Sequence, residues 1–306
     1  MTLQQLRQVL TIAESNSMNE AAKKLFVSQP NLSATVREVE EELGITVFMR
    51  NNRGITVTAE GEEFLGYAKQ VVEQYHLLEN RYLNVESKKK FSVSMQHYSF
   101  AVKAFVQLAK EVGMDEYEFA VHETKTKEVI DNVKNLKSEI GVLYLSDFNE
   151  KVLRKLFKEC DIEFKELFTC NTYVYLWKKH PLAGQKEITL DDLQEYPCLT
   201  FEQGVNNSFY YAEEMMSTYE YKRVIKADDR ATMLNLMVGL NGFTLCSGII
   251  SEDLNGDDYA AIPLKESEKM HIGYIKHKGT KLSKLGEIYI DALKNCLLYT
   301  SPSPRD

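Results

Sequence analysis

The sequence has few cysteines, and no two of them form a Cys-x-x-Cys pair. Their number is odd and their spacing is irregular, which argues against a disulfide framework and against a zinc site. We expect them to be small, reduced core residues. The five are Cys160, Cys170, Cys198, Cys246 and Cys296.

Long apolar runs are also missing. No stretch of about 18 apolar residues could cross a bilayer. The first residues, Met1 to Gln5, lack the basic-then-apolar layout of a secretory signal. We therefore expect a cytoplasmic protein that has no membrane partner.

Basic charge is not in excess, because 37 Lys and Arg residues stand against 45 Asp and Glu residues, a net charge of −8. This balance argues mildly against nucleic-acid binding, which usually needs a basic surface. The acidic excess lies outside residues 1–59, where the two kinds of charge are equal in number. A neutral segment can still bind DNA if its cations face the duplex.

Common catalytic and metal-binding motifs are absent. The sequence has no phosphate-binding loop, dinucleotide fingerprint, His-Glu-x-x-His or Gly-x-Ser-x-Gly motif, and its 6 histidines are dispersed. We therefore expect no enzyme, no cofactor and no metal. At 306 residues, with 44% hydrophobic and 27% charged residues, the chain is long enough for two globular domains.

Short helices are predicted first. Apolar residues recur at helical spacing between Leu3 and Leu43, and Gly44 is suited to end the last of these helices. Residues 45–57 read as strand, turn and strand around Asn51-Asn52-Arg53-Gly54, which predicts a hairpin.

A long helix is predicted from Thr58, as the capping residue, to Ser87. Its apolar residues step alternately by four and three, which is the spacing of a heptad seam that pairs with another helix. The alternative is a helix packed only on its own domain. The seam consists of Phe64, Ala68, Val71, Tyr75, Leu78, Tyr82 and Val85.

Residues 17–33 predict a helix-turn-helix. Ser17 and Glu20 fit a capping box, and Ser28 with Pro30 caps and opens the next helix. The small Ala21 and Ala22 allow the two helices to approach closely. The alternative is an ordinary pair of adjoining capped helices.

The start of the second helix carries short or amide side chains that suit a major groove. Gln and Asn pair with adenine edges, and Ser and Thr suit phosphates or bases. Arg50 and Arg53 flank the hairpin turn, where they would reach backbone phosphate. The predicted DNA-binding residues are Ser28, Gln29, Pro30, Asn31, Ser33, Thr35, Arg37, Arg50 and Arg53.

After Phe91, β-like and helical segments alternate. This order predicts a mostly parallel sheet covered on both faces. A second unit of the same kind, with strands in residues 167–176 and 243–246, predicts an α/β ligand-binding domain whose cleft lies between two lobes. The Pro- and Ser-rich end of the chain, residues 296–306, is predicted to be disordered or non-native.

With these elements in place, the sequence resembles the LysR-type transcriptional regulators. The resemblance is strongest over residues 3–65, and weaker pieces follow in the family's order at 179–183, 190–193 and 239–245. It rests on Ala21-Ala22, Leu25, Ser28-Gln29-Pro30, Leu32-Ser33, Val36, Val39-Glu40, Leu43-Gly44, Phe48, Arg50, Thr58 and Gly61.

The resemblance implies a winged helix-turn-helix at 1–58, a linker and dimerisation helix at 59–87, and an effector-binding domain at 88–295. That last domain would be two-lobed, α/β, and similar to periplasmic binding proteins. The implied partners are double-stranded DNA, a small-molecule effector, a second copy of the chain in a homodimer or homotetramer, and RNA polymerase.

The family also implies where the effector binds: the start of the first helix, the loop after the second strand, and the crossing between lobes. Helix N-termini with hydroxyl groups favour a carboxylate or another anion. Ser99 and Thr124 are alternatively plain helix caps, and His97 is alternatively a surface residue. The implied residues are Gln96, His97, Tyr98, Ser99, Thr124, Lys125, Thr126, Thr200 and Phe201.

The sequence therefore predicts a ligand-responsive, sequence-specific DNA-binding regulator, in which the effector alters DNA bending and transcription. The rival interpretation is a cytoplasmic small-molecule-binding protein whose N-terminal helices only mediate association.

Overall fold

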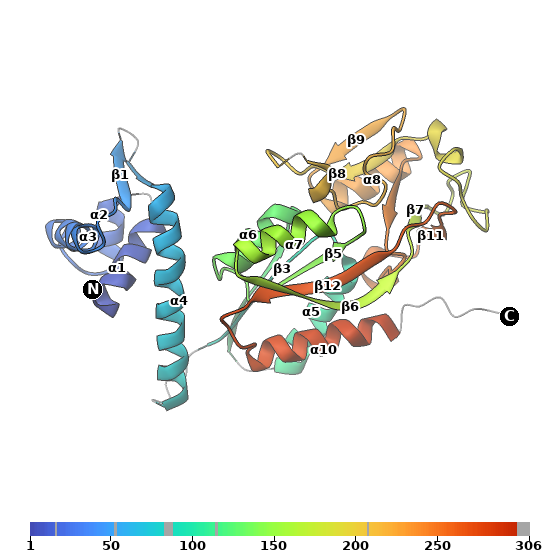
Figure 1. The fold of residues 1–306 in the computed structure, drawn as a ribbon. Coiled ribbons are helices and arrows are strands. Elements are labelled where there is room, and N and C mark those ends of the chain that lie inside the picture. Colours follow the sequence, from blue (N-terminus) through green and yellow to red (C-terminus); the bar gives the residue numbers. More distant parts are fainter. Residues whose placement is uncertain (16, 52–53, 83–87, 114–115, 207, 299–306) are drawn as a thin grey trace. The chain divides into compact units, whose positions relative to one another are not determined.

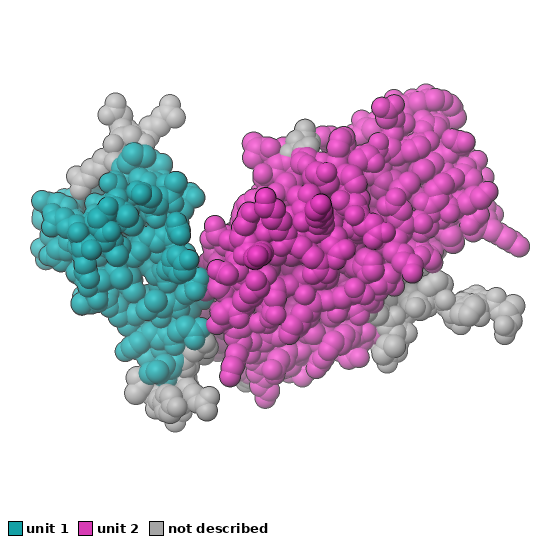
Figure 2. All heavy atoms as spheres, in the orientation of Figure 1, with its two compact units in different colours: residues 1–87 teal, residues 88–306 magenta. Residues whose placement is uncertain are grey.

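The computed structural model describes residues 1–15, 17–51, 54–82, 88–113, 116–206 and 208–298 (Figure 1). The chain divides into two compact units, Met1–Ser87 and Lys88–Asp306 (Figure 2). Among the described residues, no helix is both long enough and apolar enough to span a membrane.

The first unit is a winged helix-turn-helix followed by a long helix, as predicted. Its elements are α1 (Leu3–Ala13), α2 (Met18–Lys24), α3 (Gln29–Leu43), β1 (Phe48–Asn51), β2 (Gly54–Val57) and α4 (Ala59–Tyr82). Leu32 and Val39 of α3 are buried in its core together with Ala21 of α2. Gly44 ends α3 in the left-handed conformation, with φ 69°.

The wing is tied to both flanking helices. A carboxylate oxygen of Glu40 in α3 accepts the backbone N–H groups of Val47 and Phe48, at 2.7 and 3.0 Å. Residues 45–47 are therefore held as a connection, and the first strand begins at Phe48 rather than at the predicted Ile45. A Cβ atom on Gly61 of α4 would lie 2.4 Å from the carbonyl oxygen of Val47, so this close approach requires glycine.

The second unit contains two lobes, each built on a five-stranded sheet. Lobe 1 has the strand order β4-β3-β5-β12-β6, and lobe 2 has the order β11-β7-β10-β8-β9. The elements of lobe 1 are β3 (Lys89–Met95), α5 (Ser99–Val112), β4 (Tyr117–Glu123), α6 (Thr126–Lys134), β5 (Ile140–Leu145), α7 (Glu150–Glu159), β6 (Ile162–Cys170), β12 (Met270–His277) and α10 (Lys284–Leu298). Those of lobe 2 are β7 (Tyr173–Trp177), η1 (Asp192–Glu195), β8 (Cys198–Phe201), η2 (Phe209–Tyr211), β9 (Val224–Ala227), α8 (Arg230–Leu240), β10 (Phe243–Cys246), α9 (Glu252–Asn255) and β11 (Tyr259–Pro263).

Helices cover both faces of the lobe 1 sheet, as predicted (Figure 1). Val142 and Tyr144 of β5 pack toward α5 and α10, whereas Leu143 and Leu145 pack toward α6 and α7. This two-sided burial explains the continuous apolar run of β5, because a strand covered on both faces has no polar side. The parallel pairs β3–β4 and β3–β5 are extended by the antiparallel strand β12, so the sheet is mixed.

The chain crosses between the lobes twice, once between β6 and β7 and once between β11 and β12. The predicted assignment of residues 167–176 to the second unit is therefore wrong for its first part, which belongs to β6 of lobe 1, whereas its last part belongs to β7 of lobe 2. Periodicity did not reveal this break because both halves are apolar. At the C-terminus, α10 continues to Leu298, beyond the predicted start of the tail at 296, and residues 299–306 lie outside the described part.

Candidate functional site

Helix α3 begins as the sequence predicted. The Ser28 side chain accepts a hydrogen bond from the backbone N–H of Asn31 at 3.4 Å, and Pro30 occupies the first turn, where no backbone donor is needed. Pro30, Asn31 and Arg37 are exposed, and Gln29 is partly exposed. The start of α3 therefore presents amide and basic groups to solvent, as a recognition helix must.

Ser33 is a correction, because its side chain was expected to be exposed and is buried, with 7% of its surface accessible. Its hydroxyl bonds the side-chain amide of Gln29 at 2.8 Å. Ser33 lies one residue after the core residue Leu32, on the edge of α3 that faces the wing. Its contact with Gln29 positions an amide that is itself on the open face.

Three glutamates of α3 make contacts within the first unit. Glu42 pairs with the N-terminal amine of Met1 at 2.6 Å, and Glu38 accepts a bond from the Gln5 side chain at 3.0 Å. Glu40 holds the wing backbone. These contacts direct three acidic side chains toward α1 and the wing, away from the first turn of α3. A neutral charge count in residues 1–59 is therefore compatible with a DNA-binding face.

The two arginines predicted to contact phosphate from the hairpin are not tested by the structure. Arg53 and the side chain of Arg50 lie outside the described part of the chain. The backbone of Arg50 pairs with Ile55 in the antiparallel hairpin.

The seam of α4 divides between two uses. Phe64 packs on the core of its own unit, Ala68 is only 2% exposed, and Tyr75 lies under the guanidinium of Arg7 at 5.4 Å. The assignment of Ala68 to a partner surface is therefore corrected, and the alternative of packing on its own domain holds at Phe64 and Ala68. Heptad spacing does not distinguish the two uses, because α1 is itself a helix packed along α4.

A stripe of apolar residues on α4 stays exposed. Tyr67, Val71 and Leu78 have 58%, 51% and 55% of their surface accessible. Their spacing places them on one side of the helix. Tyr67 was not in the predicted seam, and the side chain of Tyr82 lies outside the described part.

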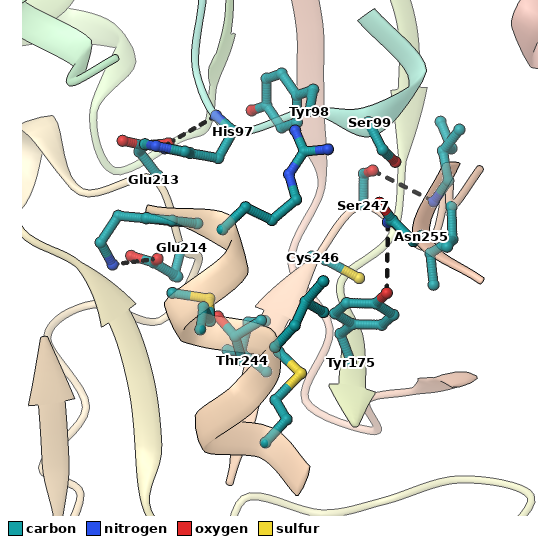
Figure 3. Close-up of a pocket in the computed structure, with 18 of the residues that line it drawn as sticks. His97, Tyr98, Ser99, Tyr175, Glu213, Glu214, Thr244, Cys246, Ser247 and Asn255 are labelled. Carbon is teal, nitrogen blue, oxygen red and sulfur yellow. Dashed lines mark hydrogen bonds and ion pairs between the residues drawn. The ribbon is translucent and has the colours of Figure 1, made fainter. Parts of the chain in front are cut away.

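A cavity in the second unit lies between residues of both lobes (Figure 3). From lobe 1 it is lined by His97, Tyr98 and Ser99, which connect β3 to α5. From lobe 2 it is lined by residues of β7, β8, α8, β10 and α9 and by the segment before β9, including Tyr175, Phe201, Glu213, Glu214, Arg230, Met233, Met237, Thr244, Cys246 and Asn255. Four of the nine predicted effector residues, His97, Tyr98, Ser99 and Phe201, therefore meet at one cavity.

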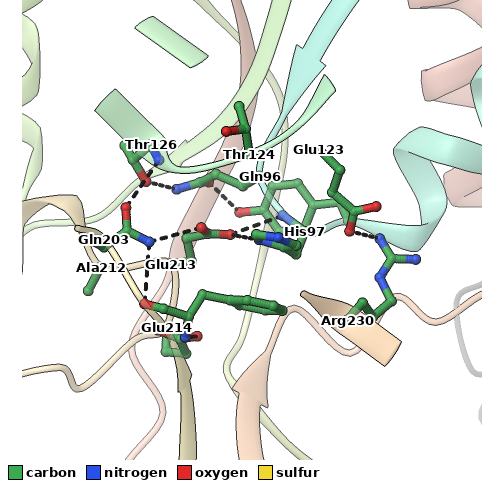
Figure 4. A network of polar contacts seen from close by, with 12 residues as sticks. Gln96, His97, Glu123, Thr124, Thr126, Gln203, Ala212, Glu213, Glu214 and Arg230 are labelled. Carbon is green, nitrogen blue, oxygen red and sulfur yellow. Dashed lines mark hydrogen bonds and ion pairs between the residues drawn. The ribbon is translucent and has the colours of Figure 1, made fainter. Parts of the chain in front are cut away.

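His97 is buried rather than a surface residue, with a side-chain exposure of 6%. Its ring nitrogen Nδ1 donates to Glu213 at 2.8 Å, and its backbone N–H donates to the same carboxylate oxygen at 3.0 Å (Figure 4). The ring stacks on Phe201 with centroids 3.6 Å apart and planes 5° apart. These contacts hold the imidazole between the two lobes.

Gln96 and Thr126 lie beside the cavity in a buried polar network. The Gln96 amide donates to the Thr126 hydroxyl at 2.6 Å, and Gln203 accepts the Thr126 backbone N–H at 3.1 Å (Figure 4). Gln203 then donates to Glu213 at 2.9 Å. The two predicted residues thus support the site through Gln203.

The other predicted effector residues, Thr124, Lys125 and Thr200, lie outside the cavity lining. Thr124 bonds Glu128, and Lys125 pairs with Asp228 at 3.5 Å. Thr200 lies in β8 of lobe 2, which is not one of the strands that connect the lobes. Neither Ser99 nor Thr124 is an N-cap, because α5 is preceded by Tyr98 and α6 by Lys125.

Sequence reasoning missed the buried acidic pair Glu213 and Glu214, with exposures of 6% and 5%. Burial and the neighbouring carboxylate of Glu213 raise the pKa of Glu214 to about 8. Glu214 accepts the Phe201 backbone N–H at 2.8 Å. One sequence signal could have identified the pair: two adjacent acidic residues lie between the apolar runs Phe209-Tyr210-Tyr211 and Met215-Met216, in a segment that otherwise reads as core.

Within the described part of the chain, no group of three or more His, Cys, Asp or Glu residues is arranged to hold a metal ion. The four described cysteines, Cys160, Cys170, Cys198 and Cys246, are free thiols. The cavity therefore offers carboxyl, guanidinium, imidazole, amide, hydroxyl and apolar groups, a set suited to binding a small molecule.

Comparison with known families matches both units. The bacterial regulatory helix-turn-helix protein, lysR family, matches residues 3–62, and the LysR substrate binding domain matches residues 96–297. The two matches include α3 and the residues from both lobes that line the cavity.

Two curated relatives come from Bacillus subtilis. The chain is 25% identical to the HTH-type transcriptional regulator CysL over 302 residues, which cover 95% of this chain and 96% of that protein. It is 30% identical to the transcriptional dual regulator GltC over 214 residues, which cover 67% of this chain and 66% of that protein.

Among solved structures, a full-length OxyR variant from Pseudomonas aeruginosa resembles the chain with a TM-score of 0.72 at 18% identity, covering 100% of this chain and 99% of that one. An OxyR mutant from Corynebacterium glutamicum has a TM-score of 0.52 at 21% identity, with 98% and 94% of the two chains covered. At these identities the likeness concerns the fold.

Proposed function

The chain belongs to the LysR family of transcriptional regulators, and from that premise we propose that it binds its operator as a homodimer through α3 and responds to a small carboxylate in the inter-lobe cavity. Members of this family bind DNA and small-molecule effectors and form oligomers. Each of these roles falls to particular residues of this chain, and none of them includes a catalytic step.

Readout of DNA falls to the first turns of α3. Gln29 and Asn31 offer amides, which pair with the N6 and N7 atoms of adenine in the major groove. Arg37 lies two turns further along the same helix and offers a charge for phosphate or guanine. The observation that carries this assignment is the exposure of Asn31 and Arg37 beside the buried core residues Leu32 and Val36.

Dimerisation falls to the exposed stripe of α4. Tyr67, Val71 and Leu78 place apolar surface in solvent on one side of the helix. Pairing with the same stripe of a second copy would remove that surface from water. A two-fold dimer presents two copies of α3 and therefore predicts an operator with two related half-sites.

Effector binding falls to the donors at the start of α5. The backbone N–H and the ring Nδ1 of His97 both donate toward one point in the cavity wall, which is a suitable arrangement for a carboxylate. Binding there would shift the equilibrium between two arrangements of the lobes. This shift would change the affinity of the dimer for DNA and the access of RNA polymerase to the promoter.

Selection from random duplexes tests the operator. We expect enrichment of a two-part sequence, and footprints over both parts. Failure to enrich any sequence would contradict the proposal and favour a small-molecule-binding protein whose N-terminal helices only mediate association.

Sedimentation tests the dimer. The pair Val71→Glu and Leu78→Glu places charge in the stripe and is expected to yield monomers that bind DNA poorly. Lys69→Glu, about half a helical turn away from the stripe, is the control and should remain dimeric. A dimeric double variant would contradict the assignment to α4.

A further inference from the structure

The segment from Tyr211 to Met216 joins the two lobes. It lies between β8 and β9 of lobe 2, yet its main chain is bonded to lobe 1. Thr126 donates to the carbonyl of Tyr211 at 2.8 Å, and the Tyr144 hydroxyl donates to the carbonyl of Ala212 at 3.0 Å. Met215 is buried in the core of lobe 1. The segment therefore fastens lobe 2 to lobe 1 at the edge of the cavity.

The Glu213 carboxylate sits in a complete set of donors. One oxygen accepts the backbone N–H and the Nδ1 of His97, and the other accepts the amide of Gln203 at 2.9 Å. The side chain is 4% exposed. A buried carboxylate is stable only with such partners.

The donors around Glu213 are oriented by groups other than Glu213. The His97 ring is stacked on Phe201, and Gln203 is fixed by the Thr126 backbone N–H (Figure 4). They would keep their direction if the Glu213 carboxylate left. The three donors therefore form a preorganised cradle for a carboxylate, whichever molecule supplies it.

The cradle opens on a cavity that has unused hydrogen-bonding capacity. Glu213 and His97 line this cavity, together with Thr244 (Figure 3). The Thr244 hydroxyl oxygen is buried and has no hydrogen-bond partner in the described part of the structure. Buried polar atoms are rarely left unsatisfied, so this hydroxyl points to a ligand.

The charges around the cavity decide how an acid enters. Glu213 and Glu214 both line it, and the Arg230 guanidinium is already paired with Glu123. An additional anion would lie beside the Glu213 carboxylate, whereas an anion that replaces Glu213 gains the same three donors. Exchange is therefore favoured over addition.

We propose that Glu213 is an internal occupant of the effector site, and that a carboxylate effector binds by displacing it from the His97–Gln203 cradle. Displacement removes the Glu213 side-chain tie between the 211–216 segment and His97 of lobe 1 and so couples ligand binding to lobe movement. This inference rests on the proposed effector role of the cavity. The internal carboxylate lowers the apparent affinity for the effector by the fraction of molecules whose cradle is empty.

Chemical rescue tests the occupancy. Glu213→Ala empties the cradle, and acetate is the probe, compared with chloride at equal ionic strength. With acetate at about five times its Kd, the melting temperature of the variant should rise by about 2–4 °C. The wild-type protein and the exposed-site control Glu220→Ala should show no rise.

The double variant Glu213→Ala/His97→Ala removes the ring donor of the cradle and should show a smaller acetate effect than Glu213→Ala. An equal acetate effect in the single and double variants, or none in Glu213→Ala, would overturn the proposal. If Glu213→Ala does not fold, Glu213→Gln keeps the side-chain volume. Its neutral amide is held less tightly than a carboxylate, so acetate should stabilise it more than the wild type, and an equal response would overturn the proposal.

Coupling is measured separately, as the difference in operator affinity between Glu213→Ala and the wild type, because the variant lacks the Glu213 tie that the effector is proposed to break. An acetate-dependent melting temperature with unchanged operator affinity would overturn the coupling while leaving the occupancy intact. If no operator exists, the proposed function fails, but the melting experiment still decides whether Glu213 fills a carboxylate cradle.

Discussion

The polar side chains on the face of α3 are exposed to solvent, whereas those of the inter-lobe cavity are buried. Asn31 and Arg37 are exposed on α3. His97 and Glu213 are buried against each other, with side-chain exposures of 6% and 4%. The first site is ready to bind as it stands, whereas the second must exchange an internal bond for an external one. A site of the second kind couples binding to a change of structure.

The contrast follows from desolvation. An exposed amide or guanidinium keeps its water until DNA approaches, whereas a buried charge must find a protein partner during folding. The cavity therefore contains protein partners for its own charged groups, whereas the face of α3 has few such partners. The following variants test this difference, beginning with the largest expected effect.

Removing the support behind α3 should have the largest effect. Leu32 is fully buried, so Leu32→Ala is expected to lower the free energy of unfolding of the first unit by roughly 2–5 kcal/mol. Urea denaturation monitored by circular dichroism measures this decrease. Leu43→Ala, at the exposed end of the same helix, is the control, with a decrease below about 1 kcal/mol. Equal decreases would contradict the assigned core.

Neutralising Glu214 should change how stability depends on pH. The pKa of Glu214 is about 8, against 4.5 for the ordinary group, so the folded state holds this proton more tightly than the unfolded state. Wild-type stability should therefore fall as pH rises from about 5 to 8, and Glu214→Gln should lack that part of the fall. Melting curves across this range measure it, with the exposed Glu220→Gln as control. Parallel curves for wild type and Glu214→Gln would contradict the burial of a titrating carboxyl.

Changing the open face should alter recognition but not folding. Gln29→Ala is expected to lose about 1–3 kcal/mol of discrimination between the operator and a variant base pair. Its folding stability should change by less than roughly 0.5 kcal/mol. Competition gel shifts measure the discrimination, and Gln4→Ala on the exposed part of α1 is the control. Unchanged affinity and preference would show that α3 does not read the bases.

Removing one cation should have the smallest effect. Arg37→Ala is expected to weaken binding to all duplexes alike and to make the plot of log affinity against log salt less steep by about 0.9 for each phosphate that is no longer neutralised. Titrations at several salt concentrations measure the slope. A changed sequence preference with the same slope would instead place Arg37 on a base.

The N-terminal unit was predicted most completely because its signals are local. Ser28, Pro30 and Gly44 mark the limits of α3 through caps and turns formed by neighbouring residues. The exception was Ser33, which is buried although its place at the start of α3 predicted an exposed side chain. The seam of α4 failed at Ala68 because periodicity shows that a face is covered but not what covers it.

The cavity was predicted in part. His97, Tyr98, Ser99 and Phe201 were found at its wall, whereas Thr124, Lys125 and Thr200 lie outside its lining. Glu213 and Gln203 escaped notice because they lie far along the chain from His97. Their role at the cavity depends on the hydrogen bonds between lobe 1 and the segment before β9, which the sequence does not show.

The sequence by itself determined the winged helix-turn-helix, the long helix after it, and the alternation of strands and helices in the second unit, because capping, turn chemistry and apolar spacing act over a few residues. Only the tertiary structure decided that a carboxylate of lobe 2 occupies the donors at the start of α5. The pairing of His97 with Glu213 joins residues more than a hundred positions apart, and only the packing of the two lobes brings them together.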